Sequence, residues 1–581
     1  MKYPTLKAPS GRREMLDTFK GYNHNLRIAD GEFYDMENMT SSYYPLLSPR
    51  GKRGVYASPA APMGLIAKDS LCYVDGESLV VNGYPVDMGL NDEPKQLVSM
   101  GAYVVIMPDK KYINTLDLTD FGSLDASFTT TADVTFELCT VDGEAYTDVT
   151  VADTEPEEPE NMALWIDTSS TPHSLKKYSA TSGMWVSIAA TYIKISSLGI
   201  GKAFAQYDGV TISGVVGESL QDLNATMVIW ACGDDYIVVT GILDAVTTQT
   251  TDDGAVTVER KMPAVDFVTE SGNRLWGCRY GVANNGEVVN EIYTCKLGDF
   301  KNWNCFMGLA TDSYYASCGT DGPFTGAITH LGFPLFFKEN FVHKVYGDYP
   351  SNFKIQDTAL RGVQRGCEKS MAIVNEILYY KARHAVVAFD GSLPVDVSAA
   401  FGEELYNEAA AGAHGNKYYV SMRDSKDNWH LFVYDTTRGM WHREDDLRAD
   451  CFCSCREELY AIDHKTRKII TMLGSGTQDR GKVKWMVQTG VIGTDMPDMK
   501  YVSRLLVRLS LEIGARVRLF AQYNSTGGWE SLGTFTGTDL RSFSLPVRPR
   551  RCDHLRLRIE GEGDAKIYSI TKTIDQGSDI S

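Results

Sequence analysis

Short apolar segments separated by turn residues follow one another along most of the chain in a similar order. A segment of small residues precedes one rich in aromatic residues, and a third then ends in Asp or a turn, as in residues 370–374, 377–380 and 385–391. Units of three or four strands that return at roughly 35–45 residues are typical of β-propeller blades. The pattern predicts an all-β protein with a β-propeller of about seven blades. Two β-sandwiches with similar hairpins are the alternative.

The blade pattern is interrupted once and stops before the end of the chain. The interruption contains alternating strands and an acidic, proline-containing linker at residues 153–160, which predicts an inserted module in two parts that folds separately. After residue 481, apolar and polar positions alternate as in a sheet with one buried face. The resulting domain map is an extended N-terminal arm (1–57), the first propeller blades (58–122), the inserted β module or modules (123–261), the remaining blades (262–480) and a C-terminal β-sandwich (481–581).

Composition and charge exclude several classes of protein. The 581 residues are 43% hydrophobic and 23% charged, which is enough to bury several cores. No apolar stretch approaches the roughly 20 residues of a membrane span, and residues 1–5 lack the apolar core of a signal peptide, so we expect neither membrane insertion nor secretion. The formal net charge of −18 argues against tight wrapping of DNA. The 12 scattered cysteines indicate free thiols in a reducing compartment.

Few segments suggest binding chemistry. Residues 199–202 (Gly-Ile-Gly-Lys) resemble a phosphate-binding loop only distantly, because no strand–turn–helix pattern surrounds them. Cys451, Cys453 and Cys455 alternate and would lie on one face of a strand. Zinc sites use CxxC pairs on turns, so a half-buried strand is the better interpretation. We therefore expect no cofactor and no metal.

Catalytic groupings are equally hard to find in the pattern. Asp234–Asp235, Asp252–Asp253 and Asp445–Asp446 stand in turn-like contexts that favour Asp for backbone reasons. Single histidines accompany the blade strands, where we expect structural or surface roles: His330, His343, His384, His414, His430, His442 and His464. The sequence thus predicts no catalytic, cofactor-binding or metal-binding residue, no enzymatic activity and no hydrolysis of glycans, peptides or nucleotides.

Two segments resemble a known family. Residues 271–279 (SGNRLWGCR) and 290–303 (NEIYTCKLGDFKNW) are similar to the NRLW…IYxSxxGDFxNW/F blade of bacteriophage tail hub or nozzle proteins, which are also called tail tubular protein B or packaged-DNA stabilisation proteins. Residues 21–39 and 45–50 look like the N-terminus of related prophage structural proteins. The resemblance covers residues 20–60 and 262–480, is weak in the insertion and is generic in the last hundred residues.

The resemblance implies a virion structural protein without a catalytic role. Such a protein forms a homo-oligomeric ring, for instance a hexamer, that extends the portal channel, retains packaged DNA and allows its ejection. The implied partners are a head-to-tail adaptor or other tail proteins, and phage DNA that passes without specific binding. The implied location is the virion tail, after synthesis in the cytoplasm of the bacterial host. The alternatives are a tail-tip or receptor-binding component of the virion and a propeller glycosidase, although no paired carboxylates stand out.

Trp276 and Trp303 lie within the segments that carry this resemblance. We expect both to be buried in a blade rather than to serve as ligand platforms, because each falls among the apolar residues of a predicted strand or turn.

Overall fold

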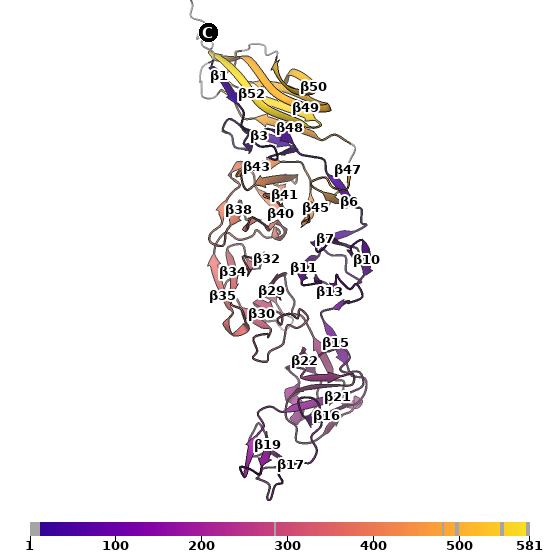
Figure 1. Cartoon of the computed structure of the whole chain (residues 1–581). Coiled ribbons are helices and arrows are strands. Elements are labelled where there is room, and N and C mark those ends of the chain that lie inside the picture. The colour runs from indigo at the N-terminus through magenta and orange to yellow at the C-terminus, as the bar shows by residue number, and fades with distance from the viewer. Residues whose placement is uncertain (1–11, 284–285, 479–480, 494–498, 546–550, 577–581) are drawn as a thin grey trace, which may run out of the picture. The chain divides into compact units, whose positions relative to one another are not determined.

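Nearly all regular structure in this protein is β (Figure 1). The computed structural model describes residues 12–283, 286–478, 481–493, 499–545 and 551–576. Strands β1–β52 and five short 3-10 turns lie within these ranges: η1 (Glu218–Leu223), η2 (Thr251–Asp253), η3 (Pro350–Asn352), η4 (Glu368–Ser370) and η5 (Ala399–Phe401). None of the helical turns found in these ranges has the length and apolar character of a membrane span. The predicted all-β fold is confirmed, and its many small sheets are consistent with propeller blades.

The chain divides into two compact units. The first unit comprises residues 1–95, 337–342 and 358–581, and the second comprises residues 96–336 and 343–357. Within the described residues, seven antiparallel groups of four or five strands have the form of blades, six as separate sheets and one as part of a 12-stranded sheet, and one of the seven crosses the boundary between the units in the sequence. This number agrees with the seven blades that the repeat predicts.

The first unit contains four of these sheets. Their strands are β7 (Pro62–Ala67), β8 (Leu71–Asp75), β9 (Ser78–Val81) and β10 (Tyr84–Asp87); β36 (Ala372–Val374), β37 (Ile377–Lys381), β38 (Val386–Phe389) and β39 (Val395–Asp396); β40 (Tyr406–His414), β41 (Lys417–Asp424), β42 (Trp429–Asp435) and β43 (Met440–Arg443); and β44 (Ala449–Cys455), β45 (Glu458–Asp463), β46 (Ile469–Thr471), β6 (Gly54–Ala57) and β47 (Thr477–Gln478). The first strands of successive sheets lie side by side, β36 by β40, β40 by β44 and β44 by β7, as the inner strands of propeller blades do.

Burial on both faces explains the composition of these strands. In β41, five consecutive residues from Tyr418 to Met422 are buried, which a sheet with one solvated face would not allow. Tyr419, Leu431 and Leu459 pack into one core between neighbouring sheets. The strong apolar runs of the repeat therefore reflect sheets that are covered on both sides.

The C-terminal β-sandwich is built around two long strands and receives strands from the N-terminal arm. Its strands are β48 (Lys484–Thr489), β49 (Lys500–Tyr523), β50 (Glu530–Leu545), β51 (Leu555–Glu562) and β52 (Ala565–Gln576), and the arm adds β1 (Arg12–Leu16), β2 (Gly21–Tyr22) and β3 (Glu32–Glu37) to the same sheet. β2 also pairs with β43, so this sheet continues into the blade of β40–β43, while β4 (Met39–Thr40) and β5 (Ser48–Pro49) pair with each other. β1 pairs with β52 and β3 pairs with β48. β49 pairs with β52 in its first half, with β51 in its second half, and with β50 along most of its length.

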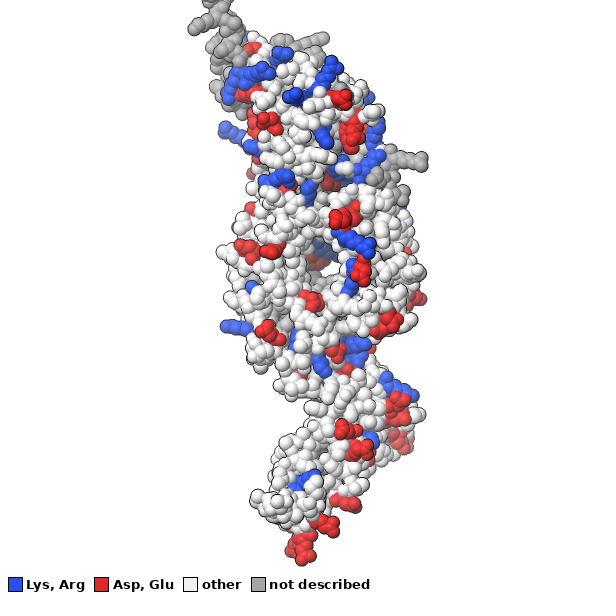
Figure 2. All heavy atoms as spheres, viewed as in Figure 1, with Lys and Arg blue, Asp and Glu red and all other residues white. Residues whose placement is uncertain are grey.

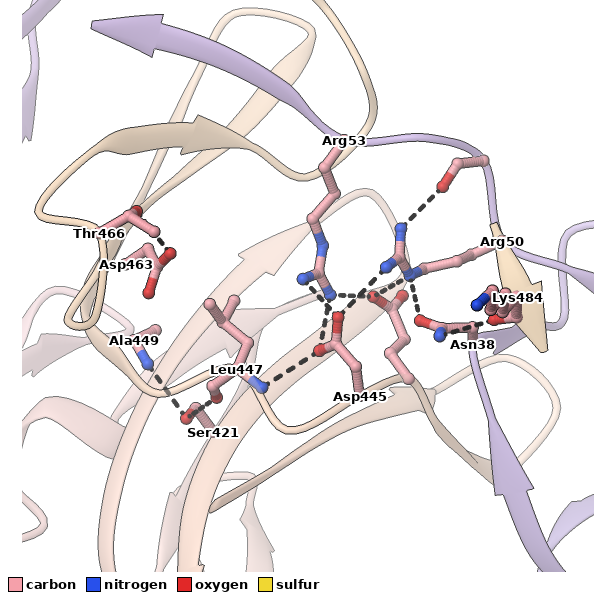
Figure 3. A network of polar contacts seen from close by, with 12 residues as sticks. Asn38, Arg50, Arg53, Ser421, Asp445, Leu447, Ala449, Asp463, Thr466 and Lys484 are labelled. Atoms are coloured by element: carbon pink, nitrogen blue, oxygen red, sulfur yellow. Dashed lines mark hydrogen bonds and ion pairs between the residues drawn. The ribbon is translucent and has the colours of Figure 1, made fainter. Parts of the chain in front are cut away.

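A network of charged side chains ties the arm to the loop between β43 and β44 (Figure 3). The guanidinium of Arg53 donates to Asp445 at 2.7 Å and to Glu444 at 2.8 Å, and Arg50 Nη2 donates to Asp445 at 3.1 Å. Arg50 also donates to the side chain of Asn38, whose amide donates to the carbonyl of Lys484. Burial alone would raise the pKa of Asp445, but Arg53 and Arg50 hold it below its usual value.

The second unit contains the remaining blade-type sheets. Their strands are β11 (Gln96–Met100), β12 (Tyr103–Met107), β13 (Lys111–Asn114) and β14 (Phe121–Ser123); β28 (Phe267–Ser271), β29 (Arg274–Val282), β30 (Val288–Thr294) and β31 (Tyr314–Ser317); and β32 (Gly326–His330), β33 (Phe333–Phe337), β34 (Phe341–Tyr346) and β35 (Lys354–Ala359), of which the last sheet crosses the boundary. β11 lies beside β28, and β28 lies beside β32. The blade order along the chain thus continues across the insertion.

The two motifs of the phage-like segment have structural roles. Arg274 is buried, and its guanidinium donates to the carbonyls of Cys295, Asp312 and Ala310 at 2.7, 2.6 and 2.9 Å. Trp276 and Trp303 are each 3% exposed, so their expected burial is confirmed.

The Gly-Asp-Phe-Lys-Asn-Trp turn is likewise held by local hydrogen bonds. Asn302 donates to Asp299 at 2.6 Å, and the indole N–H of Trp303 donates to the carbonyl of Phe300 at 2.9 Å. These contacts shape a loop whose Phe300 and Trp303 pack in a core shared with the neighbouring sheet of β11–β13. The motif therefore encodes the folding of a blade and does not by itself specify what the blade does.

The insertion has its own cores. Its strands are β15 (Ala126–Thr129), β27 (Thr257–Arg260), β22 (Gly209–Ser213) and β23 (Thr226–Val228); β24 (Ala231–Gly233), β25 (Tyr236–Thr240), β21 (Tyr192–Ser196), β16 (Val134–Cys139) and β26 (Thr247–Gln249); and β17 (Val149–Ala152), β18 (Leu164–Asp167), β19 (Ser174–Ser179) and β20 (Met184–Ser187). The first two sheets share one core that includes Phe136 and Val258, and the third packs Ile166 and Leu175 in a smaller one. Asp208 of the insertion binds Arg260 and accepts from Asn302 at 2.8 Å.

Candidate active site

The structure places the residues considered for phosphate and metal binding in structural positions. The N–H of Gly199 donates to the carboxylate of Asp235 at 2.7 Å, so this turn faces an acidic group rather than an anion site. Cys451 and Cys453 lie on β44, and burial raises their pKa to about 11 and about 12. Within the described ranges, no three His, Cys, Asp or Glu side chains are arranged to hold a metal ion.

The histidines beside the blades have varied surroundings. His330, His343 and His442 are buried, and burial lowers the pKa of His442 to about 3, so this ring stays neutral. His430 contacts Asp424 at 2.9 Å, and His464 contacts Asp450 at 2.8 Å. His414 is half-buried and His384 is exposed. His554, which contacts both a hydroxyl and a carboxylate, is not among the histidines that accompany the predicted blade strands.

Ser525, His554 and Asp553 form this grouping in the C-terminal sandwich. The Oγ atom of Ser525 lies 2.8 Å from Nε2 of His554, and Nδ1 of His554 lies 2.9 Å from a carboxylate oxygen of Asp553. A hydroxyl, an imidazole and a carboxylate in this order are the elements of a nucleophile with its general base and its orienting group. Both distances lie within the range for effective proton transfer.

The pairing of two strands brings these residues together. β49 ends at Tyr523 opposite Leu555, the first residue of β51. Beyond this pair, the N–H of Asn524 donates to the carbonyl of His554, and the side chain of Asn524 accepts from the N–H of Asp553, both at 2.9 Å. The turn that carries Ser525 is thereby fastened to the residues before β51, so the nucleophile and its base are fixed by backbone contacts.

The turn itself has a conformation that is uncommon for side-chain-bearing residues. Asn524 and Ser525 both have φ of +51°, and Gly527 has φ of +71°. Left-handed φ values at non-glycine residues are sparsely populated and are enriched at functional sites. In the described residues, no acceptor is found for the N–H groups of Ser525, Gly527 and Gly528.

The hydrogen-bond partners determine the chemistry of the imidazole. An ionised carboxylate only accepts hydrogen bonds, so Nδ1 of His554 carries its proton toward Asp553 and a neutral ring leaves Nε2 as an acceptor for the hydroxyl of Ser525. The hydrogen bond from His554 lowers the pKa of Asp553, which keeps this carboxyl ionised. The side chain of Asp553 is 57% exposed and that of His554 is 22% exposed, so the site is open to solvent.

The sequence contained little that would have revealed this grouping. Ser525 stands in Asn-Ser-Thr-Gly-Gly, which is a turn signal but not the GxSxG pattern of a nucleophile elbow. Asp553 and His554 are adjacent in the chain, but the contact with a turn 29 residues earlier depends on the pairing of β49 with β51. Triads are recognised by geometry rather than by sequence position.

Lys381 is a buried titratable group outside this grouping. It is 2% exposed, and Nζ donates to the side chain of Gln364 at 2.9 Å and to backbone carbonyls. Burial lowers the pKa of Lys381 to about 8, against about 10.4 for an unfolded lysine. Between these values the unfolded chain binds more protons than the folded chain, so this lysine makes stability increase with pH.

We expect Lys381→Met to remove this dependence. The free energy of unfolding of the wild type, relative to that of the variant, should rise by about 3 kcal/mol between pH 8 and pH 10.4. Urea unfolding at a series of pH values measures the difference. Lys465→Met, at an exposed position, should show no such rise. If the difference in unfolding free energy between wild type and Lys381→Met did not change with pH, the pKa of Lys381 would not be lowered in the folded state.

The comparisons with known proteins concern the fold. No family model matches the chain, and no curated protein matches it. Among solved structures, the chain is similar to an exo-β-1,3-galactanase from Phanerochaete chrysosporium, with 8% identity over 52% of this chain and 94% of the other and a TM-score of 0.23. It is also similar to a GH43 glycoside hydrolase with endo-xylanase and exo-arabinofuranosidase activity (9% identity, 54% and 97% coverage, TM-score 0.19). PorZ of the type-IX secretion system of Porphyromonas gingivalis gives 9% identity, 88% and 82% coverage and a TM-score of 0.26.

These findings contradict the function predicted from the phage-like segments. The named structures include glycoside hydrolases and no tail protein, so the prediction of a non-enzymatic virion component, whether tail hub, nozzle or tail tip, is wrong. The physical reason lies in the motif, because Arg274 and Asn302 are engaged in folding the blade. Identities and TM-scores at this level transfer no activity or substrate to this chain. The expected ring partners and virion location stay predictions.

Proposed function

We propose that the C-terminal β-sandwich is an acyl hydrolase that cleaves esters through Ser525. The observation that supports this function is the pair of contacts that joins the hydroxyl of Ser525 to His554 and His554 to Asp553. A serine hydroxyl is a weak nucleophile alone and becomes effective when an adjacent base accepts its proton during attack. Both the base and its orienting carboxylate are in contact here.

The reaction follows from the positions of the protons. Oγ of Ser525 attacks the ester carbonyl while its proton moves to Nε2 of His554, and the imidazolium is stabilised by Asp553. The C–O bond to the alcohol then breaks, and the departing oxygen takes the proton from Nε2. A water molecule activated by His554 attacks the acyl-serine, which releases the acid and restores the hydroxyl.

Covalent labelling of the full-length protein tests the proposal. A fluorophosphonate probe should modify one serine per chain, and peptide mass spectrometry should place it on Ser525. Hydrolysis of p-nitrophenyl acetate should occur in the wild type and should be lost in Ser525→Ala and in His554→Ala. Ser531→Ala, at an exposed serine of β50, should behave as the wild type. An unlabelled wild type, or equal labelling of Ser525→Ala, would refute the proposal.

A further inference from the structure

A row of cationic side chains begins next to His554 and extends along one face of the sandwich. Alternate residues of β51 point to one face, so Arg556 and Arg558 share the side of the sheet that carries His554. The residues between them, Leu555, Leu557 and Ile559, are buried. From His554 to Glu562 this face extends over about 26 Å at roughly 3.3 Å per residue.

The neighbouring strand extends the row. Arg516 and Arg518 of β49 are exposed on the same face, because they alternate with the buried Val517 and Leu519. The register places Arg516 opposite Glu562 and Arg518 opposite Glu560. Together with Lys484 of β48, these side chains form what we call the basic strip: Lys484, Arg516, Arg518, Arg556 and Arg558.

A groove opens at the far end of the basic strip. It has a volume of about 380 Å³, and its lining includes Lys484, Arg516, Arg518 and Arg558. Arg518 is paired with Glu560 at 2.9 Å, but the side chains of Arg516 and Lys484 have no hydrogen-bond or ion-pair partner in the described residues. Two cations in this groove are therefore available to an anionic ligand.

Acidic residues in the same groove restrict the kind of anion. Glu37, Glu560 and Glu562 line it next to the cations. Burial, followed by the nearby Asp35, Asp445 and Asp446, raises the pKa of Glu37 despite the opposing effect of Arg443, which reduces its repulsion of a negative ligand. Closely spaced phosphates would meet the remaining carboxylates, whereas hydroxyl groups can donate to them. The groove suits a ligand that carries both carboxylates and hydroxyls.

The distribution of charge along the chain supports binding of an anionic ligand by the C-terminal sandwich. The C-terminal sandwich, residues 481–581, has 15 Lys and Arg against 11 Asp and Glu, a net charge of +4, while the chain as a whole has −18. The insertion, residues 123–261, has 6 against 21, a net charge of −15. Figure 2 shows Lys and Arg side chains over the C-terminal sandwich and a gathering of Asp and Glu at the end of the insertion near β17.

We infer that the basic strip binds an acidic polysaccharide, a polymer of uronate-type sugars, and presents its acyl esters to Ser525. Arginine pairs with carboxylates through parallel N–H donors, and sugar hydroxyls satisfy the glutamates between them. The strip leads from the groove to His554 along one sheet face, so a bound polymer would extend to the nucleophile. The inference rests on the proposed function for its last step, and the binding step stands separately.

Binding of unesterified polygalacturonate to the full-length protein tests the strip without requiring catalysis. Isothermal titration calorimetry should show binding to the wild type and to Ser525→Ala with equal affinity, and a neutral galactan should not bind. Replacing both Arg516 and Arg518 by Gln should weaken binding at least tenfold. Arg508→Gln, at an exposed position of β49 outside the groove, should leave the affinity unchanged.

The outcomes separate the two proposals. Absence of polygalacturonate binding in the wild type, or an unchanged affinity in the double variant, overturns the basic strip as a polysaccharide site even if Ser525 is labelled by the fluorophosphonate. Binding of single-stranded DNA with equal affinity, weakened by the same double variant, also overturns it in favour of a nucleic-acid surface. If the wild type binds polygalacturonate but Ser525 is not labelled by the fluorophosphonate, the proposed hydrolase activity is refuted. The basic strip then stands as a polysaccharide-binding site.

Discussion

Asp445→Asn should destabilise the first unit by about 3–5 kcal/mol at neutral pH, because it removes one partner from a buried cluster of charges. The change keeps the size of the side chain but leaves Arg53 and Arg50 with Glu444 as their sole carboxylate among the contacts shown in Figure 3. A buried guanidinium that loses its counter-ion keeps the cost of leaving water without the compensating attraction. Urea unfolding followed by far-UV circular dichroism measures the loss.

The pH dependence of the same variant has a defined sign. Because the pKa of Asp445 is lowered in the folded state, its contribution is complete above the unfolded value of about 3.9 and is lost as pH falls through the folded value. The stability difference between wild type and Asp445→Asn should therefore shrink below about pH 3.9. Asp446→Asn is the matched control, since Asp446 is exposed, and should change stability by no more than about 0.5 kcal/mol. Equal effects of the two changes would show that the cluster is not buried.

Trp276→Ala should lower the stability of the second unit by about 3–5 kcal/mol. The indole packs in a core with Ile292 and Phe336, its ring centroid lies 5.0 Å from that of Phe353, and its N–H donates to the carbonyl of Ser271 at 3.3 Å. Truncation would leave a cavity in the blade and remove the hydrogen bond to Ser271.

Urea unfolding of the wild type and the Trp276 variants can be followed by the fluorescence of the other tryptophans, such as Trp303. Trp276→Phe, which keeps an aromatic ring in the cavity, should lose less stability than Trp276→Ala, because most of the buried apolar surface remains. If the alanine variant unfolded at the same urea concentration as the wild type, the assignment of β29 to a packed blade would be wrong.

The blade strands could be predicted from the sequence, but the candidate active site could not. Strands such as β41 are apolar on both faces, and this local property predicts a covered sheet from residues alone. The insertion and the change of pattern near residue 481 are also local features. By contrast, the contact of Ser525 with His554 depends on the register of β49 against β51, and the buried role of Asp445 depends on two arginines nearly 400 positions away. Pairings between distant segments leave no periodic trace in a single sequence.

The strand order of the first unit also constrains when it can fold. The segments synthesised first supply partners for those synthesised last: β6 completes the sheet of β44–β46, β3 pairs with β48, and β1 pairs with β52. A growing chain on the ribosome therefore holds edge strands whose neighbours do not yet exist. Contacts of such long sequence separation fold slowly and expose unpaired edges in the meantime. The first unit is therefore complete only after β52 has been synthesised, and a nascent chain shorter than residue 565 has no partner to offer β1.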